Sequence, residues 1–355
     1  MRTRTTVTIA AAAAVLSGLS LAPADAGGAT GQGEGPRWSS RPTGTEEQYR
    51  GLDGVSRRVA WVAGEDGGVL RTTDGGRTWQ DVAPPRTGKL AFRDVEAQDA
   101  LNASVLSIGT GTDSRIYTTD DGGQSWTLAF VNRRPQAFYD CMAFWPGGRR
   151  GLAMSDPVDG KFRIIATRDG GHSWRVLSDR GMPRAVDGEF AFAASGTCLV
   201  TGGRRHAWLA SGGTASRIFH TRDAGHTWTV AKSKIPAAPA GGVFSLSFRN
   251  LRHGVAVGGD FTAPRNGSDA SSRSRNGGNR WISGGDLSGY RSGVAWVKGR
   301  PGTVVAVGPT GSDISRSGGR RWTRFSGKAF DAVDCNDAGI CWASGPEGAV
   351  ARLRF

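Results

Sequence analysis

The chain has 355 residues and a formal net charge of +14. Glycine is abundant, with 55 residues, yet hydrophobic residues still make up 38% of the chain. This balance excludes an intrinsically disordered protein and indicates a folded one with many turns.

The first 26 residues have the features of a secretory signal peptide. Two arginines precede an apolar stretch over residues 7–21, and Ala24-Asp25-Ala26 supplies the small-x-small pattern of a cleavage site. We expect a secreted, extracellular protein whose mature chain begins near Gly27. The alternative is an anchor that stays attached, but the apolar run is short for a membrane-spanning helix.

From residue 72 onwards, an eight-residue turn recurs at a spacing of roughly 41 to 54 residues, about the length of one four-stranded propeller blade. Asp followed by Gly-Gly favours a hairpin turn, in which the carboxylate accepts backbone N–H groups two residues on and the Trp packs over the turn. We therefore predict a structural role for these residues. The four strong copies contain Asp74 and Trp79, Asp121 and Trp126, Asp169 and Trp174, and Asp223 and Trp228, and two weaker copies begin at Ser274 and Ser315.

The segments around these turns predict an all-β, seven-bladed β-propeller of four-stranded antiparallel blades. Alternating strands precede the turns, as at residues 115–118 and 217–220, and an apolar strand ending in glycine precedes those, as at residues 60–64. Six turns and a seventh half-copy in residues 339–355 give seven blades. We expect residues 37–39 to supply the missing outer strand, so that residues 27–355 form one closed domain.

The pattern Ser/Thr-x-Asp-x-Gly-x-x-Trp resembles the Asp-box, or bacterial neuraminidase repeat, of sialidases, sortilin-type receptors and xyloglucan-cleaving endoglucanases. Residues 59–79 are more similar to one subgroup, the photosystem II stability/assembly factor-like propellers. The resemblance covers nearly the whole mature chain and implies a propeller that serves in assembly. Nothing in the sequence connects the chain to a photosynthetic partner.

In propellers, ligands bind where the loops that enter the innermost strands meet those joining the second and third strands. Longer loops at residues 155–161, 202–208 and 259–265 are expected to extend this face. We predict a ring of charge at the channel mouth. Its basic members are Arg50, Arg93 and Arg291, and its acidic members include Asp140, Glu189 and Asp331. The candidate ligand-binding residues are Arg50, Arg93, Tyr139, Arg204, Arg205 and Arg291.

These features favour a secreted, non-catalytic binding or assembly scaffold for a protein or a cell-wall or glycan partner. A basic protein outside the cytoplasm meets anionic polymers before it meets nucleic acid, so we expect no nucleic-acid partner. We also expect no stable membrane insertion and a monomeric protein.

The alternative is a glycoside hydrolase with a two-carboxylate mechanism, for which Asp140, Asp156, Glu189 and Asp260 are the candidates. A true sialidase uses a Tyr nucleophile. This activity is disfavoured, because the chain has only four tyrosines and lacks the Arg-Ile-Pro segment typical of that family. An oxidoreductase is more remote, since no dinucleotide, haem or Cys-x-x-Cys motif is present. We expect no cofactor, and no metal, because two of the five histidines lie inside the repeated turns.

The four cysteines fit an oxidising compartment. Cys335 and Cys341 lie across a short turn and are expected to form a disulfide. Cys141 and Cys198 can pair only if their strands are neighbours, which the sequence leaves open.

Overall fold

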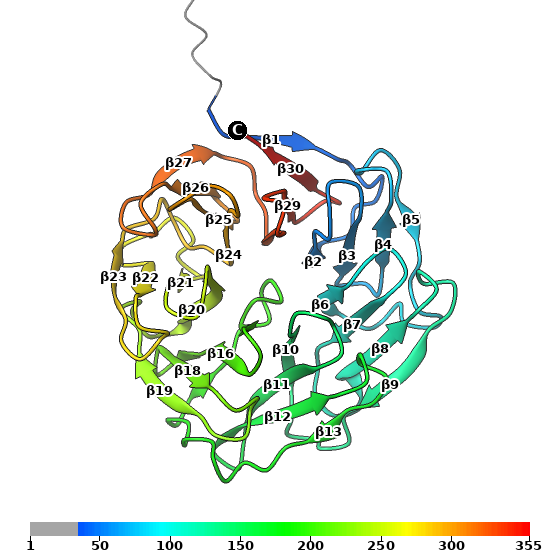
Figure 1. Ribbon diagram of the computed structural model, residues 1–355, viewed down its shortest axis with the longest axis horizontal. Coiled ribbons are helices and arrows are strands. Elements are labelled where there is room, and N and C mark those ends of the chain that lie inside the picture. The colour runs from blue at the N-terminus through cyan, green and yellow to red at the C-terminus, as the bar shows by residue number, and fades with distance from the viewer. Residues whose placement is uncertain (1–34) are drawn as a thin grey trace, which may run out of the picture. The chain divides into compact units, whose positions relative to one another are not determined.

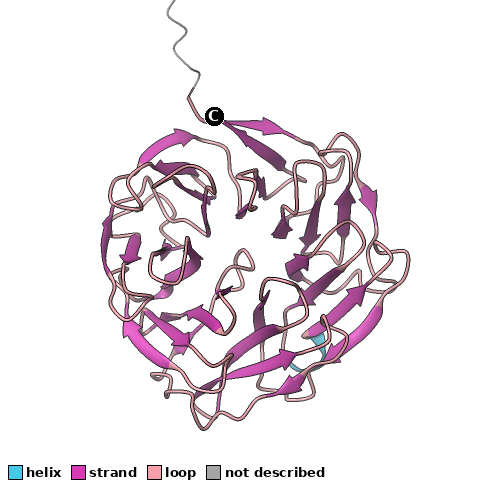
Figure 2. Ribbon diagram, in the orientation of Figure 1, coloured by secondary structure: helices cyan, strands magenta, loops and turns pink. Residues whose placement is uncertain are grey.

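The computed structural model describes residues 35–355, which form seven antiparallel sheets arranged as the blades of a ring (Figure 1). The predicted signal peptide lies outside the described residues. Strands dominate, and within residues 35–355 the one helical element is the 3-10 helix Gly111–Asp113 (Figure 2). In this same range no helix has the length and apolar character needed to cross a membrane.

Each blade begins with its innermost strand. Blade 1 contains β2 (Tyr49–Asp53), β3 (Ala60–Gly64), β4 (Val69–Thr72) and β5 (Gln80–Asp81), and blade 2 contains β6 (Phe92–Ala97), β7 (Ala103–Ser107), β8 (Arg115–Thr119) and β9 (Thr127–Val131). Blade 3 contains β10 (Tyr139–Phe144), β11 (Gly151–Val158), β12 (Lys161–Thr167) and β13 (Arg175–Val176). Blade 4 contains β15 (Leu199–Gly202), β16 (His206–Ala210), β18 (Arg217–Thr221) and β19 (Thr229–Lys232).

Blades 5 to 7 complete the ring. Blade 5 contains β20 (Ala238–Phe248), β21 (Gly254–Asp260), β22 (Ser271–Ser274) and β23 (Ile282–Gly285), with the two-residue strands β17 (Gly212–Gly213) and β14 (Glu189–Phe190) added beyond β20. Blade 6 contains β24 (Gly293–Trp296), β25 (Val304–Gly308), β26 (Gly311–Ser315) and β27 (Thr323–Ser326). Blade 7 contains β28 (Ala332–Cys335), β29 (Cys341–Ser344), β30 (Val350–Arg354) and the N-terminal strand β1 (Arg37–Ser40).

The ring closes through the N-terminal strand, as predicted. Strand β1 pairs antiparallel with β30, with Trp38 opposite Leu353 and Ser40 opposite Ala351. The first and last strands therefore share one blade, which removes the open sheet edge that a half-complete blade would expose.

The ring has two faces, which we name here. The top face is where the innermost strands begin and where the second and third strands of each blade connect. The bottom face contains the loops between the first and second strands, which bond to the repeated turns. For example, the Gly75 N–H donates to Arg58 O at 2.8 Å and the Gly170 N–H to Arg149 O at 2.9 Å.

All six repeated turns share one hydrogen-bond pattern on the bottom face. In each, the hydroxyl at position one accepts the N–H of position five at 2.9–3.0 Å. The side chain at position three accepts the N–H of position seven at 2.8–3.0 Å, which is four residues on rather than the predicted two. The weaker copies keep the pattern because Asn276 and Ser317 also provide a side-chain oxygen.

Four carboxylates, of which Asp94 is buried and the others are half-buried, join neighbouring innermost strands. Each accepts a backbone N–H from the next blade, and their burial raises the pKa of all of them. The interblade bonds are Ala97 N to Asp53 Oδ2 (2.7 Å), Met142 N to Asp94 Oδ2 (2.7 Å), Phe144 N to Glu96 Oε2 (3.2 Å) and Gly54 N to Asp334 Oδ2 (2.9 Å).

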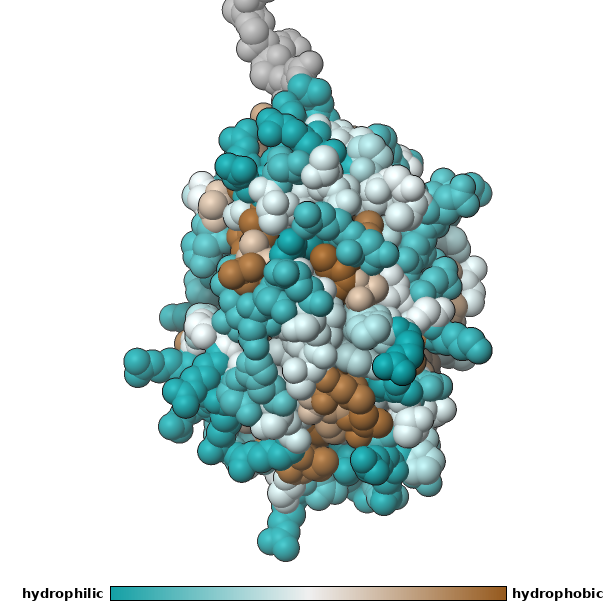
Figure 3. Space-filling view, turned by 90° about the vertical axis from the view of Figure 1, so that its right-hand side faces the viewer, coloured by the Kyte–Doolittle hydropathy of each residue, from teal (hydrophilic) through white to brown (hydrophobic). Residues whose placement is uncertain are grey.

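The outer side of the ring in Figure 3 is mostly hydrophilic, with separate hydrophobic patches.

Candidate functional site

A cluster of charged side chains lies on the top face at the start of β2, β6 and β28. Glu65, from the loop between β3 and β4, pairs with the Arg50 Nε and lies 3.1 Å from the Arg93 Nη2. The Arg50 Nη1 also lies 3.1 Å from Asp331 Oδ1, and Gln48 donates to the other Asp331 oxygen at 2.8 Å. We call these residues, with Gln48, the charged cluster. It brings together three residues of the predicted ring.

The charged cluster is partly buried and electrically balanced. The side chains of Arg50 and Arg93 are 22% and 21% exposed. Burial and the nearby Arg50 charge lower the pKa of Arg93, and burial raises the pKa of Asp331 against the opposing charge of Arg50. The Arg93 Nε is buried with no hydrogen-bond partner. Two guanidinium groups are thus held beside two carboxylates, with one donor still unsatisfied.

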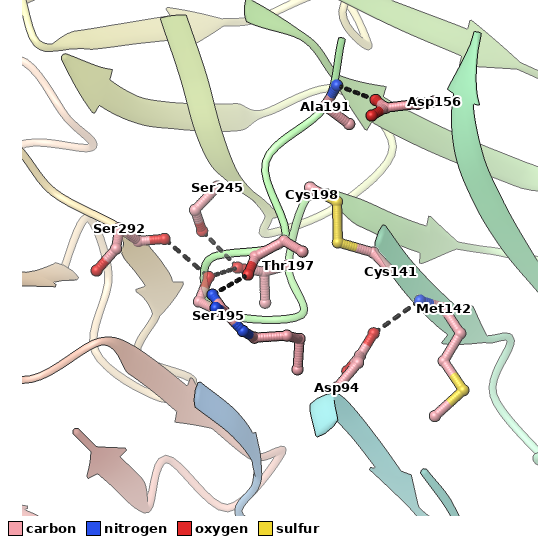
Figure 4. Close-up of a disulfide and its surroundings, with 12 residues drawn as sticks. Asp94, Cys141, Met142, Asp156, Ala191, Ser195, Thr197, Cys198, Ser245 and Ser292 are labelled. Atoms are coloured by element: carbon pink, nitrogen blue, oxygen red, sulfur yellow. Dashed lines mark hydrogen bonds between the residues drawn. A yellow bond between two sulfur atoms is a disulfide. The ribbon is translucent and has the colours of Figure 1, made fainter. Parts of the chain in front are cut away.

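A short segment, residues 191–197, crosses the central channel, and we call it the plug. Its ends and middle bond to four different blades. At its start the Ala191 N–H donates to Asp156 Oδ1 at 2.7 Å, and near its end Ser195 Oγ donates to Ser292 O at 2.7 Å (Figure 4). The Arg93 Nη1 donates to Ala193 O at 3.1 Å. The plug therefore ties the charged cluster to the interior of the ring.

The disulfide Cys141–Cys198 holds the end of the plug against blade 3 (Figure 4). Cys141 lies in β10 and Cys198 directly precedes β15, so the strands left open by the sequence are neighbours. The second disulfide, Cys335–Cys341, joins β28 to β29 and confirms the predicted bridge.

The plug explains why Glu189 is not where we predicted it. Glu189 was expected where the chain enters an innermost strand, yet β14 pairs with β17 and the innermost strand of blade 4 starts only at Leu199. The intervening residues form the plug instead. Glu189 is buried and forms an ion pair with Arg217.

The predicted positions of three arginines are also wrong. Arg291 is fully buried rather than at the channel mouth, because its guanidinium turns between strands to Asp313 Oδ2 at 2.7 Å. Arg204 and Arg205 are exposed in the hairpin between β15 and β16. That hairpin joins a first strand to a second, which places both residues on the bottom face, opposite Arg50 and Arg93.

The four candidate carboxylates have different environments. Asp140 is buried, and its pKa is raised by burial and by the neighbouring Asp156 charge. Burial raises the pKa of Asp156 itself to about 6. Asp260 instead accepts both the N–H and the hydroxyl of Thr262 within its own loop. Glu189 is occupied by Arg217. Tyr139 is buried, and its ring meets Phe130 edge-on with centroids 5.2 Å apart.

The bottom half of the channel contains a cavity of about 560 Å³. The ends of the innermost strands line it, with Phe144, Phe248 and Trp296 among the apolar walls and Glu96 and Asp334 among the acidic ones. Thr197, the last residue of the plug, is also part of the wall. The plug thus lies between this cavity and the top face. Among residues 35–355, no group of three or more His, Cys, Asp or Glu side chains is arranged to hold a metal ion.

Our prediction did not include Glu65, Gln48 or the plug. The rule that loops between second and third strands reach the top face applies to Glu65, which follows the glycine ending the strand at residues 60–64. No comparable sequence signal marks the plug.

No family model and no curated protein matches this chain in sequence. Its fold is similar to a YCF48 bound to a D1 peptide (TM-score 0.62, 16% identity, 90% of this chain and 95% of that one) and to YCF48 from Cyanidioschyzon merolae (TM-score 0.60, 16%, 89% and 98%). It is also similar to a GH74 enzyme from Niastella koreensis (TM-score 0.61, 13%), where 88% of this chain covers 53% of the enzyme. At these identities the similarity establishes the β-propeller fold.

Proposed function

We propose that this protein is a non-catalytic scaffold that holds an acidic segment of a protein partner on its top face. The observation that carries the proposal is the charged cluster. Arg50 and Arg93 each keep about a fifth of the side chain exposed. Carboxylates of a partner can therefore replace Glu65 and Asp331 as acceptors, in charge-assisted hydrogen bonds of the same kind.

The fold and the net charge of the chain support a polypeptide partner. A YCF48 with a similar fold is described as bound to a D1 peptide, so a propeller of this form holds a peptide in at least one case. The net charge of +14 also favours approach of an acidic segment. A cell-wall or glycan partner is the alternative occupant of the same face.

We further propose that the protein is secreted and belongs to the Asp-box propellers. The hydrogen bonds of the repeated turns, for example Thr72 and Asp74 to the backbone of residues 76–78, support that kinship. Two disulfides are compatible with an oxidising compartment outside the cytoplasm.

We do not propose a hydrolytic role. The two carboxylates that influence each other are Asp140, which is 1% exposed, and Asp156, one oxygen of which accepts the Ala191 N–H. A general acid or nucleophile has to reach the scissile bond, so this arrangement offers little support for glycoside hydrolysis. Release of reducing sugar from cell-wall polymers by the purified protein would contradict this view.

The proposal is tested by measuring binding of a blocked synthetic peptide rich in Asp and Glu, a neutral control peptide, and an anionic cell-wall polymer. The purified protein should bind the acidic peptide, and Arg50→Glu with Arg93→Glu should weaken binding at least about tenfold through lost charge-assisted bonds. The matched control is Arg204→Glu with Arg205→Glu, which changes the net charge equally on the bottom face.

Equal weakening by the two double variants would contradict a top-face site and indicate unspecific attraction. Binding of the polymer but not of the acidic peptide would favour the glycan alternative. Thermal unfolding of each variant, together with the milder Arg93→Gln, separates lost binding from lost folding.

A further inference from the structure

Five aromatic rings form a continuous group on the top face, which we call the aromatic cluster. It consists of Phe190, Phe192, Phe244, Phe261 and Tyr290. Phe192 stacks on Phe244 with ring centroids 3.8 Å apart and planes 11° from parallel. Phe261 meets both rings edge-on at 6.2 and 6.3 Å, and Phe190 meets Phe192 edge-on at 5.0 Å. The edge-on pairs at these distances have a favourable arrangement of phenyl rings.

The backbone around the rings is shaped to receive them. A Cβ atom on Gly212 would lie 2.3 Å from the Phe192 ring, and one on Gly213 would lie 2.8 Å from the Phe190 ring. Side chains at these two positions of β17 would displace the rings. Two consecutive glycines therefore leave the space in which Phe190 and Phe192 sit.

Phe261 is the exposed member of the aromatic cluster. Half of its surface, 50%, is exposed, whereas Phe192 is 8% and Phe244 is 2% exposed. Its position in the loop after β21 is held by its own N–H, which donates to Ala240 O at 3.1 Å, and by the neighbouring Asp260–Thr262 bonds. A held phenyl ring with one free side offers apolar contact to a partner.

The aromatic cluster adjoins the charged cluster at two points. Phe192 directly precedes Ala193, whose carbonyl accepts the Arg93 Nη1. The Tyr290 ring lies 4.7 Å from the Phe244 ring, and its phenol interacts electrostatically with Arg50, Arg93 and Asp331. The Phe244 ring in turn lies 6.3 Å from the Phe261 ring, so these two ring contacts connect Phe261 to the neighbourhood of the charged cluster. An extended peptide, which rises about 3.3–3.6 Å per residue, spans this path in a few residues.

We propose that the top face recognises a polypeptide segment in which one aromatic or large aliphatic side chain lies a few residues from a carboxylate. The apolar side chain packs on Phe261 and Phe190 while the carboxylate meets Arg50 and Arg93. This inference deepens the proposed function and rests on it. In this proposal the aromatic cluster selects among acidic segments, because charge alone does not distinguish one acidic segment from another.

The exposed and half-buried rings of the aromatic cluster, Phe261 and Phe190, have no hydrogen-bonding groups. A phenyl or leucyl side chain of a polypeptide buries apolar surface on them and brings no polar group that needs a partner. The C–H face of a sugar ring stacks on phenyl rings as well, so the polysaccharide probe below separates the two kinds of partner.

The test uses blocked acidic peptides that contain one phenylalanine, with matched peptides that have alanine at that position, and an acidic polysaccharide as a third probe. The unmodified protein should bind the phenylalanine peptide roughly tenfold more tightly than the alanine peptide, as expected for partial burial of one phenyl group. Phe261→Ser should reduce this preference to within about twofold. Leu101→Ser is the matched control, since Leu101 is 51% exposed on the bottom face.

Equal binding of the two peptides by the unmodified protein would overturn the aromatic selection and leave the proposed function standing. Retention of the full preference by Phe261→Ser would overturn the assignment as well. Binding of the polysaccharide alone would overturn both the inference and the proposed function. The inference is supported if the preference for the phenylalanine peptide disappears in Phe261→Ser and survives in Leu101→Ser, and if thermal unfolding curves show that both variants are folded.

Discussion

Removing the disulfide Cys141–Cys198 should destabilise the ring more than removing Cys335–Cys341. The first closes a loop with a sequence separation of 57 and the second one of 6. A cross-link restricts the unfolded chain more when it closes a longer loop, and the loop-entropy relation gives about 4 kcal/mol for the first and about 2 kcal/mol for the second.

These free energies translate into modest shifts of the unfolding temperature. A chain of this size has an unfolding entropy of about 0.7 kcal/mol per kelvin, at about 2.1 cal/mol/K for each residue. Cys141→Ala with Cys198→Ala should therefore lower Tm by about 6 °C, and Cys335→Ala with Cys341→Ala by about 3 °C. Both side-chain pairs are replaced by the same residue, so the second variant controls for the loss of sulfur atoms.

Calorimetry and urea unfolding of the two variants, without reductant, measure the difference. A loss for the short loop that equals or exceeds the loss for the long loop would refute the loop-entropy reasoning. Limited proteolysis adds a local readout, because residues 191–197 should be cleaved faster once Cys198 no longer holds the end of the plug.

Other predictions follow from the same structure. Asp121→Ala should lower Tm, because the hydroxyl and N–H of Ser125 lose their acceptor. Those bonds lower the pKa of Asp121 to about 2, below its unfolded value near 3.8, so their contribution to stability is present above pH 4 and is lost as the pH falls towards 2, as acid unfolding will show. Burial raises the pKa of Asp156 to about 6, so the folded state binds more protons than the unfolded state does between pH 7 and 4. Tm should therefore rise as the pH falls from 7 to 4, and Asp156→Asn should flatten that rise. Gly196→Val should displace the plug and lower Tm, since φ is +74° and a Cβ would lie 2.4 Å from Asp94 Oδ1.

The ring itself was predictable because each blade repeats its own local signals. In six of the seven blades, the turn after the third strand places a Ser or Thr, a second side-chain oxygen from Asp, Asn or Ser, and a glycine at fixed offsets, and these residues act on their own backbone within eight positions. The apolar residues 60–64 likewise became the buried strand β3. Local chemistry of this kind is present in the sequence whatever the rest of the chain does.

The charged cluster was predictable only in part. Arg50, Arg93 and Asp331 occupy equivalent places at the start of innermost strands, so the repeat indicated their common face. Arg291 occupies the same place, yet it is buried, because Asp313 on β26 offers a closer partner than the channel mouth does. The choice between these two environments depends on the contact of Arg291, which lies two residues before β24, with Asp313 on β26, and the repeat does not encode that contact.

The plug could not be predicted from the repeat, for a different reason. The residues between Trp174 and β15 interrupt the blade pattern, and their positions depend on Asp156, Arg93, Ser245 and Ser292, which are contributed by four blades. Such contacts exist only once the ring has closed. Our prediction that an innermost strand starts at Glu189 was wrong because we counted this insertion as part of a blade.

The plug also bears on the kind of partner that we propose for the top face. Residues 191–197 lie between the top face and the cavity near Trp296, and Thr197 bonds to Ser245. The groups that we propose for binding therefore lie side by side at the surface, where Arg93 contacts the plug at Ala193, directly after Phe192. An extended segment lying across such a surface would be selected by the order of the side chains along it.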